Sequence, residues 1–288
     1  MNTTFVTAIY SQLSDGSVGR WDRYSCSLKS LMKCEANFVV FISPDDLDRF
    51  NEFVEVESLD RNRLWTIVRP IESCIWHDKF TLLKSRYDSA GRSMDLVHSK
   101  IDWLSEIASE NPFNDDYIFW IDAGLSFTGM FPNRYLTNVD HGARFHRYTD
   151  LTVFSSEWVG RLKEKCNQKL YTIALTPKNF LWAQPLPRKF YLNDYASWHI
   201  IGGLFGGHRE NIPTFRYLYH STVLLVLQEY IDNDLDRKLP VEELILNVVV
   251  ANNPEIFSLE TFDTWYHEDH ESTFDEYKNG KPFYTLFI

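Results

Sequence analysis

The sequence predicts an α/β fold with a mostly parallel central sheet and helices on both faces. Through the first half of the chain, short apolar stretches alternate with longer helical segments, and this order implies parallel pairing with right-handed crossovers. Residues 117–121 form an unbroken apolar run, which is typical of a strand buried on both faces. The chain has 288 residues, of which 44% are hydrophobic, and this is enough to bury a substantial core.

Each expected element follows from its local pattern. In the first half, we expect strands at residues 5–10, 37–42, 64–68 and 117–121, and helices at 24–33, 45–53, 76–87 and 97–109. Asn111 and Pro112 should close the last of these helices. In the second half, we expect a strand at 144–148, a loop at 176–188 and helices at 157–171, 212–231 and 239–250. A change in pattern near residue 150 therefore separates a sheet-rich half from one of loops and helices.

The apolar run at 117–121 leads into two residues that bear on function, Asp122 and Gly124. In open α/β sheets the ligand crevice lies beyond the carboxyl ends of the strands, so an Asp there aims its oxygens into the crevice. A nearby glycine lets a ligand approach the backbone closely. An Asp close to a glycine also commonly caps a turn. This stretch alone leaves both interpretations open.

Charge and cysteine content limit the class of protein. The formal net charge of -11 argues against broad binding of nucleic acid, which needs a basic face. The cysteines form no C-x-x-C pair and indicate reduced thiols in a cytoplasmic protein; they are Cys26, Cys34, Cys74 and Cys166. We expect no signal peptide, and no transmembrane segment, because no apolar run approaches the roughly 20 residues that cross a bilayer.

Basic residues near the strands are candidates for binding a nucleotide. Arg20 and Arg23 follow the polar loop after the first strand, where many phosphate sites begin. That loop has neither G-x-G-x-x-G nor the Walker spacing. Lys100 lies near the start of the helix before residues 117–121 and would place a cation beside the same crevice. Taken by themselves, Arg20 and Arg23 are better explained as ordinary arginines of a surface loop, and Lys100 as part of a solvated helix face.

A glycine-rich segment follows Trp198 and His199. Residues 202–207 read Gly-Gly-Leu-Phe-Gly-Gly and hold four of the chain's 12 glycines. Because glycine weakens a strand, this density predicts a backbone that must turn or let a ligand lie against it. Two acids, Glu242 and Glu243, open a helix about 40 positions further on, where the helix dipole favours negative charge.

Other reaction classes find little support. His267 and His270 are spaced i and i+3, but neither H-E-x-x-H nor paired cysteines accompany them, so we exclude a zinc site. A serine hydrolase would need a G-x-S-x-G elbow, which is absent. No cysteine lies in a setting typical of a nucleophile.

The order of these motifs resembles a GT-A glycosyltransferase, whose core is Rossmann-like. The strings Val6-Thr7-Ala8 and Trp120-Ile121-Asp122-Ala123-Gly124 specifically resemble the HtrL/YibB (WlaTC-like) family of bacterial glycosyltransferases. The resemblance covers most of the chain. It implies a single domain over 1–288, with a nucleotide-sugar-binding half at 1–150 and an acceptor-binding half at 151–288.

The second half also resembles retaining transferases of the blood-group type. Their Gly-Gly-x-Phe-Gly-Gly segment matches Gly202 to Gly207, and their Asp-Glu-x-x-Leu-Asn motif matches residues 242–247. This resemblance implies that Glu243 acts at the reactive face of the donor sugar, as nucleophile or electrostatic stabiliser. Without it, Glu243 would be taken for an ordinary acid of a first helical turn.

The metal motif of the GT-A fold is Asp-x-Asp, and here Gly124 occupies the second position. Hard cations want several oxygen ligands. The resemblance therefore implies Mn²⁺ or Mg²⁺ held by Asp122, the donor diphosphate, water and His267.

These expectations combine into one hypothesis of sugar transfer from a nucleotide sugar, most simply a UDP-sugar. Tyr10 would stack on the base, and Arg20, Arg23 or Lys100 would contact ribose or phosphate near Asp122 and Gly124. The cleft for donor sugar and acceptor would be formed by Trp198, His199, Gly202, Gly203 and Glu242. The acceptor would be a glycan of the lipopolysaccharide core or capsule. A modified, hydroxymethylated base of phage DNA is an alternative, as is a degenerate domain that binds a glycan without catalysis.

Overall fold

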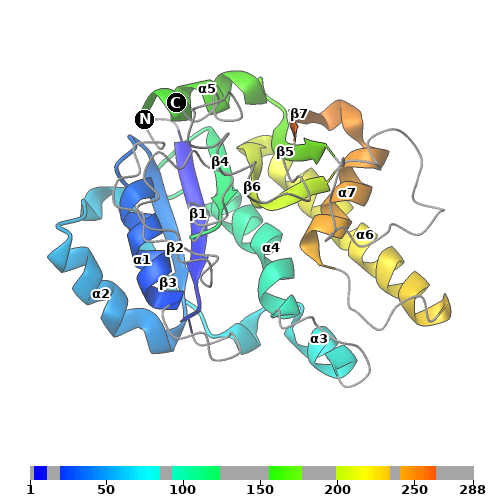
Figure 1. The fold of residues 1–288 in the computed structure, drawn as a ribbon, viewed down its shortest axis with the longest axis horizontal. Helices are drawn as coiled ribbons and strands as arrows, with labels where there is room; N and C mark the ends of the chain where they lie inside the picture. The colour runs from blue at the N-terminus through cyan, green and yellow to red at the C-terminus, as the bar shows by residue number, and fades with distance from the viewer. Residues whose placement is uncertain are drawn as a thin grey trace, which may run out of the picture.

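A seven-stranded sheet with the strand order β3-β2-β1-β4-β6-β5-β7 forms the centre of the molecule (Figure 1). The computed structural model describes residues 3–11, 20–84, 93–123, 156–176, 199–233 and 241–263. The strands are β1 (Thr3–Ile9), β2 (Asn37–Ile42), β3 (Leu64–Val68), β4 (Tyr117–Ile121), β5 (Leu170–Thr176), β6 (His199–His208) and β7 (Phe257–Asp263). The α-helices are α1 (Arg20–Leu31), α2 (Leu47–Val56), α3 (His77–Lys84), α4 (Met94–Glu110), α5 (Ser156–Cys166), α6 (Ile212–Asn233) and α7 (Glu242–Asn252).

Most strands of the sheet run in the same direction. Strands β3, β2, β1 and β4 pair in parallel, and β5 pairs in parallel with β7. Strand β6 is antiparallel to both of its neighbours, β4 and β5. The predicted α/β class and the mostly parallel sheet are therefore confirmed.

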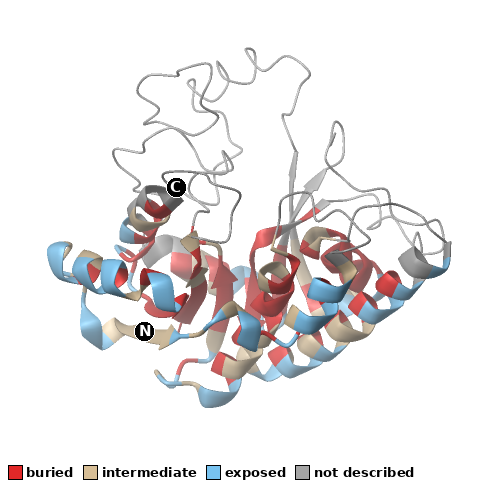
Figure 2. Ribbon diagram, turned by 90° about the horizontal axis from the view of Figure 1, so that it is seen from below, coloured by how far each residue is buried: buried red, intermediate tan, exposed pale blue. Residues whose placement is uncertain are grey.

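Helices cover both faces of the sheet. In β1, alternate side chains point to opposite faces, as the period of two requires, so Val6 and Phe5 belong to different hydrophobic clusters. The Val6 cluster contains residues of α4, α6 and α7, and the Phe5 cluster contains residues of α1, α2 and α5. Figure 2 shows the buried residues concentrated in the sheet and on the helix faces that meet it.

The described strands and helices of the first half overlap the ranges that the sequence predicts, although α1 begins at Arg20, four residues before its expected start. The stop after α4 has the expected cause, since Asn111 is left-handed (φ 43°) and its N–H bonds to the carbonyl of Ile107 at 2.8 Å. The second half differs from the prediction, because it supplies three strands of the sheet. The helix expected at 157–171 ends at Cys166, since Asn167 (φ 43°) and Gln168 (φ 62°) are both left-handed, and β5 begins shortly afterwards.

The glycine-rich segment is part of strand β6, so the expectation that its backbone turns is wrong. Gly206 and Gly207 both have φ of 149°. A Cβ atom on Gly206 would lie 2.4 Å from the carbonyl oxygen of Ile118 in β4. A Cβ atom on Gly207 would lie 2.3 Å from the carbonyl oxygen of Lys169, just before β5. These glycines therefore let two neighbouring strands approach β6.

The structure bears on several remaining expectations. Three cysteines are buried free thiols, as expected (Cys34, Cys74 and Cys166). Burial raises the pKa of the Cys74 thiol to about 11, which does not favour a nucleophile.

In the part of the chain that is described, no helix is both long and apolar enough to cross a bilayer. The strand expected at 144–148 lies outside the described residues.

Candidate active site at the carboxyl ends of β1 and β4

The neighbouring strands β1 and β4 form the topological switch point of the sheet. From β1 the chain proceeds outward through β2 to β3, and it then returns to place β4 on the other side of β1. Ligands of open α/β sheets bind beyond the carboxyl ends of the strands at such a point. Tyr10 follows β1 directly and Asp122 follows β4, so two predicted site residues flank the switch point.

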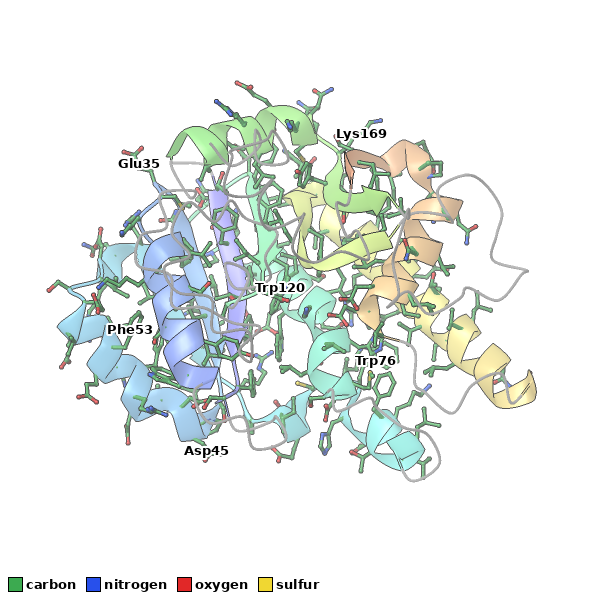
Figure 3. The ribbon with its side chains drawn as sticks, in the orientation of Figure 1. Glu35, Asp45, Phe53, Trp76, Trp120 and Lys169 are labelled. Carbon is green, nitrogen blue, oxygen red and sulfur yellow. The ribbon has the colours of Figure 1, made fainter. Side chains whose placement is uncertain are left out.

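The Asp122 carboxylate is held in place and partly exposed. The indole Nε1 of Trp120 donates to Asp122 Oδ1 at 2.7 Å, and Trp120 lies near the centre of the molecule (Figure 3). The backbone N–H of Asp122 donates to the carbonyl of Gly203 in β6 at 2.9 Å. The side chain is still 36% exposed. Asp122 is therefore more than a turn cap, since it presents an oriented carboxylate to solvent.

Lys100 of α4 connects Asp122 to Glu242. Its Nζ lies 2.9 Å from Asp122 Oδ1 and 2.9 Å from Glu242 Oε1, and it donates to the carbonyl of Gly202 at 3.1 Å. The ammonium also lies 5.7 Å from the ring centroid of Trp120. Burial alone lowers the pKa of Lys100, but the two carboxylates outweigh it and raise the pKa above its ordinary value. The ammonium therefore stays charged, and these three side chains carry a formal charge of one negative unit.

Gly202 makes room for Glu242. A Cβ atom at Gly202 would lie 2.7 Å from Cγ and 2.8 Å from Oε1 of Glu242, so only glycine fits there without movement. Asn247, one turn further along α7, accepts a hydrogen bond from the backbone N–H of Ile200 at 3.0 Å. Together these contacts hold the first turns of α7 against β6. The sequence predicts that the glycine-rich segment leaves space for a ligand close to its backbone. Such a space exists at Gly202, but the side chain of Glu242 fills it.

Of the two acids that open α7, Glu242 is the one that joins the cluster around Lys100. Successive residues of a helix point about 100° apart, so Glu243 faces a different direction. Glu243 is half-buried, and its charge acts on the phenol of Tyr219. Burial, and then the charges of Glu242 and Glu243, raise the pKa of Tyr219 well above its ordinary value. The catalytic role expected for Glu243 stays a prediction.

The structure brings some of the predicted donor-binding residues to the carboxyl edge of the sheet. Tyr10 is 2% exposed, its ring stacks on Trp103 with centroids 5.7 Å apart, and its hydroxyl donates to the carbonyl of Arg69 at 2.7 Å. A base would stack on this ring only after it became uncovered, so that contact stays a prediction. Arg20 and Arg23 lie in the first turn of α1, but the positions of their side chains are not described.

Several predicted site residues cannot be placed. Gly124, Trp198 and His267 lie outside the described residues. His199 begins β6, but its side chain is not described. The roles expected for these residues stay predictions.

Two contacts of this site are not predicted from the sequence, although each has a signal there. They are the ion pair of Lys100 with Glu242 and the hydrogen bond from Trp120 to Asp122. Lys100 continues the three- and four-residue spacing of the buried residues Leu104 and Ile107, so it belongs to the buried face of α4. Trp120 and Asp122 are two residues apart at the end of a strand, which places them on the same face of the sheet.

The residues present are compatible with a divalent cation that is bound mainly through substrate. Within the described ranges, no group of three or more His, Cys, Asp or Glu side chains is arranged to hold a metal ion. Mg²⁺, however, is commonly held by one or two carboxylates together with substrate phosphates and water. Asp122 offers one such carboxylate, whose Oδ2 has the longer contact with Lys100, at 3.2 Å.

No family model matches the chain, and no curated protein matches it either. Mouse xyloside xylosyltransferase 1, in its apo form, is 13% identical with a TM-score of 0.48, over 98% of this chain and 94% of that one. An active-site mutant of LgtC is 12% identical with a TM-score of 0.44, over 97% and 85% of the two chains.

A third solved structure belongs to a different class of enzyme. It is 4-diphosphocytidyl-2C-methyl-D-erythritol synthase from Anaerococcus prevotii, at 11% identity and a TM-score of 0.41, over 95% of this chain and 94% of that one. At TM-scores below 0.5, these likenesses do not establish a shared fold.

Proposed function

We propose that the protein is a GT-A-type glycosyltransferase that moves a sugar from a nucleotide-sugar donor to a glycan acceptor. The observation that carries the proposal is the position of Asp122, which presents an oriented, partly exposed carboxylate at the switch point between β1 and β4. A diphosphate bound over this edge of the sheet would meet Asp122 directly.

In this proposal the residues around Asp122 keep the site organised. Lys100 and Trp120 fix the carboxylate, so that little reorganisation is needed when the donor binds. Glu242 and Lys100 hold the start of α7 beside the same site. Glu243 follows Glu242 directly, and in this proposal it belongs to the cleft for the donor sugar. Glu243 then acts at the anomeric centre, with retention of configuration.

The donor is a UDP-sugar in this proposal, with Mn²⁺ or Mg²⁺ held by Asp122 and by His267. A divalent cation, when bound, neutralises the charge that develops on the departing nucleoside diphosphate. Tyr10, Arg20 and Arg23 contribute contacts to the nucleotide.

We infer that the acceptor is a glycan of the lipopolysaccharide core or capsule, as the resemblance to the HtrL/YibB family implies. A modified DNA base is the weaker alternative. The basic residues between Lys79 and Lys100 would favour it. Of these, Lys100 is only 7% exposed and already contacts two carboxylates, so it adds nothing to a basic surface.

One observation favours a second candidate function, a GT-A-type domain that binds a glycan without catalysis. Both oxygens of Asp122 already contact the ammonium of Lys100, at 2.9 and 3.2 Å, and a glycine occupies the position of the second metal-binding Asp. An internal cation would then take the place of the metal.

Donor hydrolysis separates these candidates. The protein is incubated with a panel of nucleotide sugars and Mn²⁺, and release of nucleoside diphosphate is measured for the wild type, Asp122→Ala and Glu243→Ala. A transferase loses turnover by a factor on the order of 10³ in either variant while each stays folded. No hydrolysis or binding of any donor by the folded wild type would reject the transferase proposal.

A further inference from the structure

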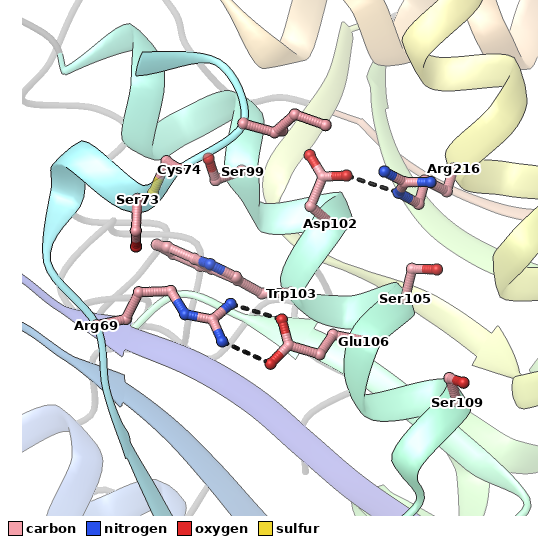
Figure 4. A pocket seen from close by; sticks show the side chains of 11 residues that line it. Arg69, Ser73, Cys74, Ser99, Asp102, Trp103, Ser105, Glu106, Ser109 and Arg216 are labelled. Carbon is pink, nitrogen blue, oxygen red and sulfur yellow. Dashed lines mark hydrogen bonds and ion pairs between the residues drawn. The ribbon is translucent and has the colours of Figure 1, made fainter. Parts of the chain in front are cut away.

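A groove of about 380 Å³ runs along the solvent-facing side of α4 (Figure 4). We call it the α4 groove. It is lined mainly by α4, by the segment between β3 and α3, and by Arg216 of α6. Asp102, which lines it, is two positions from Lys100, and such residues point about 200° apart around a helix. The groove therefore lies on the opposite face of α4 from the Asp122 site.

The carboxylates and arginines that line the α4 groove are paired with one another, and Asp102 also lies 2.9 Å from Nε2 of His220. Arg69 donates to Glu106 through both terminal nitrogens, at 2.5 and 2.7 Å, and Arg216 Nε donates to Asp102 at 2.6 Å. Figure 4 shows the two arginines reaching α4 from opposite sides. The indole of Trp76 adds a 3.2 Å hydrogen bond to Asp102. A phosphate or carboxylate ligand would have to displace an acid from its arginine, and a cation would have to displace an arginine from its acid.

Hydroxyl groups and a small apolar surface complete the lining. Ser105 and Ser109 come from the exposed side of α4, next to Glu106. Ile75, which is 59% exposed, supplies an apolar contact at the other wall. From Ser99 to Ser109 the helix rises about 15 Å, which suits an extended ligand of two or three ring-sized units.

We propose that the α4 groove binds a neutral oligosaccharide. Sugar hydroxyls both donate and accept hydrogen bonds, so they can bind the carboxylates, the arginine N–H groups and the serines without breaking either ion pair. The C–H face of a sugar ring suits the side chain of Ile75. The fixed geometry of the paired groups lowers the entropy lost on binding. In the proposed transferase, the groove would hold the part of the acceptor that lies remote from the reacting sugar. This role rests on the proposed function, whereas the binding of a neutral oligosaccharide does not.

Saturation-transfer NMR on the full chain tests the proposal. The probes are three neutral trisaccharides (cellotriose, maltotriose and mannotriose), with trigalacturonic acid and chitosan trimer as charged comparisons. We expect saturation transfer to at least one neutral trisaccharide and none to the charged ones. Ser105→Trp, which fills the groove, should weaken that binding at least about tenfold. The matched control Ser221→Trp, at a half-buried serine of α6 that does not line the groove, should bind as the wild type does.

Binding that survives Ser105→Trp, a preference for either charged trimer, or no transfer to any neutral trisaccharide would overturn the proposal. Asp122→Asn is measured in parallel and should bind the trisaccharide normally. The two proposals can fail separately. If Ser105→Trp abolishes trisaccharide binding but the wild type hydrolyses no donor, the groove proposal stands and the transferase proposal is rejected. If the wild type hydrolyses a donor but binds no neutral trisaccharide, the transferase proposal stands and the groove proposal is rejected.

Discussion

Lys100 of α4 and Glu242 of α7 form a buried ion pair of 2.9 Å between residues that are 142 positions apart. Their side chains are 9% and 5% exposed. The pair joins the helix that precedes β4 to the helix that packs against β6, and Asp122 shares the same ammonium. The two halves of the chain therefore meet at Asp122, the proposed metal-binding carboxylate, and the stability of the fold is coupled to the geometry of the site.

Lys100→Met should lower the free energy of unfolding by about 3–5 kcal/mol, because it leaves the buried carboxylate of Glu242 without its cation. Urea denaturation measures this loss. The double variant Lys100→Met/Glu242→Leu removes both charges and should recover a large part of it. Strictly additive losses from the two single substitutions would show that the pair does not couple the two helices.

Gly202→Ala should destabilise the protein by about 1–3 kcal/mol, because the new methyl group overlaps the side chain of Glu242. Combining it with Glu242→Ala should relieve the overlap. Gly160→Ala in α5 is the matched control, since no described atom apart from its chain neighbours and its own helix backbone lies within 4 Å of its added Cβ. It should be neutral or stabilise the protein by up to about 1 kcal/mol. Equal urea midpoints for the two alanine variants would contradict the packing described for Gly202.

Trp120→Phe keeps an aromatic ring in the core but removes the N–H that donates to Asp122. Donor turnover should fall about tenfold, since the carboxylate loses one of the groups that orient it. Trp76→Phe is the control, because it removes an indole donor to Asp102, which lines the α4 groove instead. Its hydrolysis of the donor, measured without acceptor, should match that of the wild type. If both variants retain full turnover, the indole of Trp120 does not position Asp122.

The sequence predicts those parts of this structure that depend on local patterns. Strands β1 to β4 are short apolar runs with clear ends, and α4 stops where Asn111 adopts a left-handed conformation. Asp122 could be placed at the carboxyl edge because the strand before it is short and continuous. The sequence thus gives the position of the candidate site before any contact within it is known.

Contacts between distant segments account for what the sequence does not predict. Glycines disfavour a strand, yet β6 contains four of them, since the carbonyl of Ile118 and the side chain of Glu242 occupy the space where Cβ atoms would lie. Those neighbours come from β4 and α7, and no local pattern reveals them. The pairing of Lys100 with Glu242 depends on the same packing of α7 against β6.

Cys34→Ala should make stability less sensitive to alkaline pH. Burial raises the pKa of this thiol from 9.0 to about 12, so the folded protein keeps the proton while the unfolded chain loses it. The unfolded state then binds fewer protons above about pH 9, and the free energy of unfolding falls by up to about 1.4 kcal/mol per pH unit from this group alone. Below about pH 8 both states are protonated, and the contribution is constant.

Urea unfolding between about pH 7.5 and 10.5 measures this effect as a difference in slope between the wild type and Cys34→Ala. Ser27→Ala is the control, because it removes a buried polar group that does not ionise in this range, and it should keep the wild-type slope. The absolute loss from each substitution reflects the cavity it leaves and does not enter the comparison. Parallel pH profiles for all three proteins would mean that the Cys34 thiol ionises equally in the folded and unfolded chains. That result would contradict the complete burial described for this side chain.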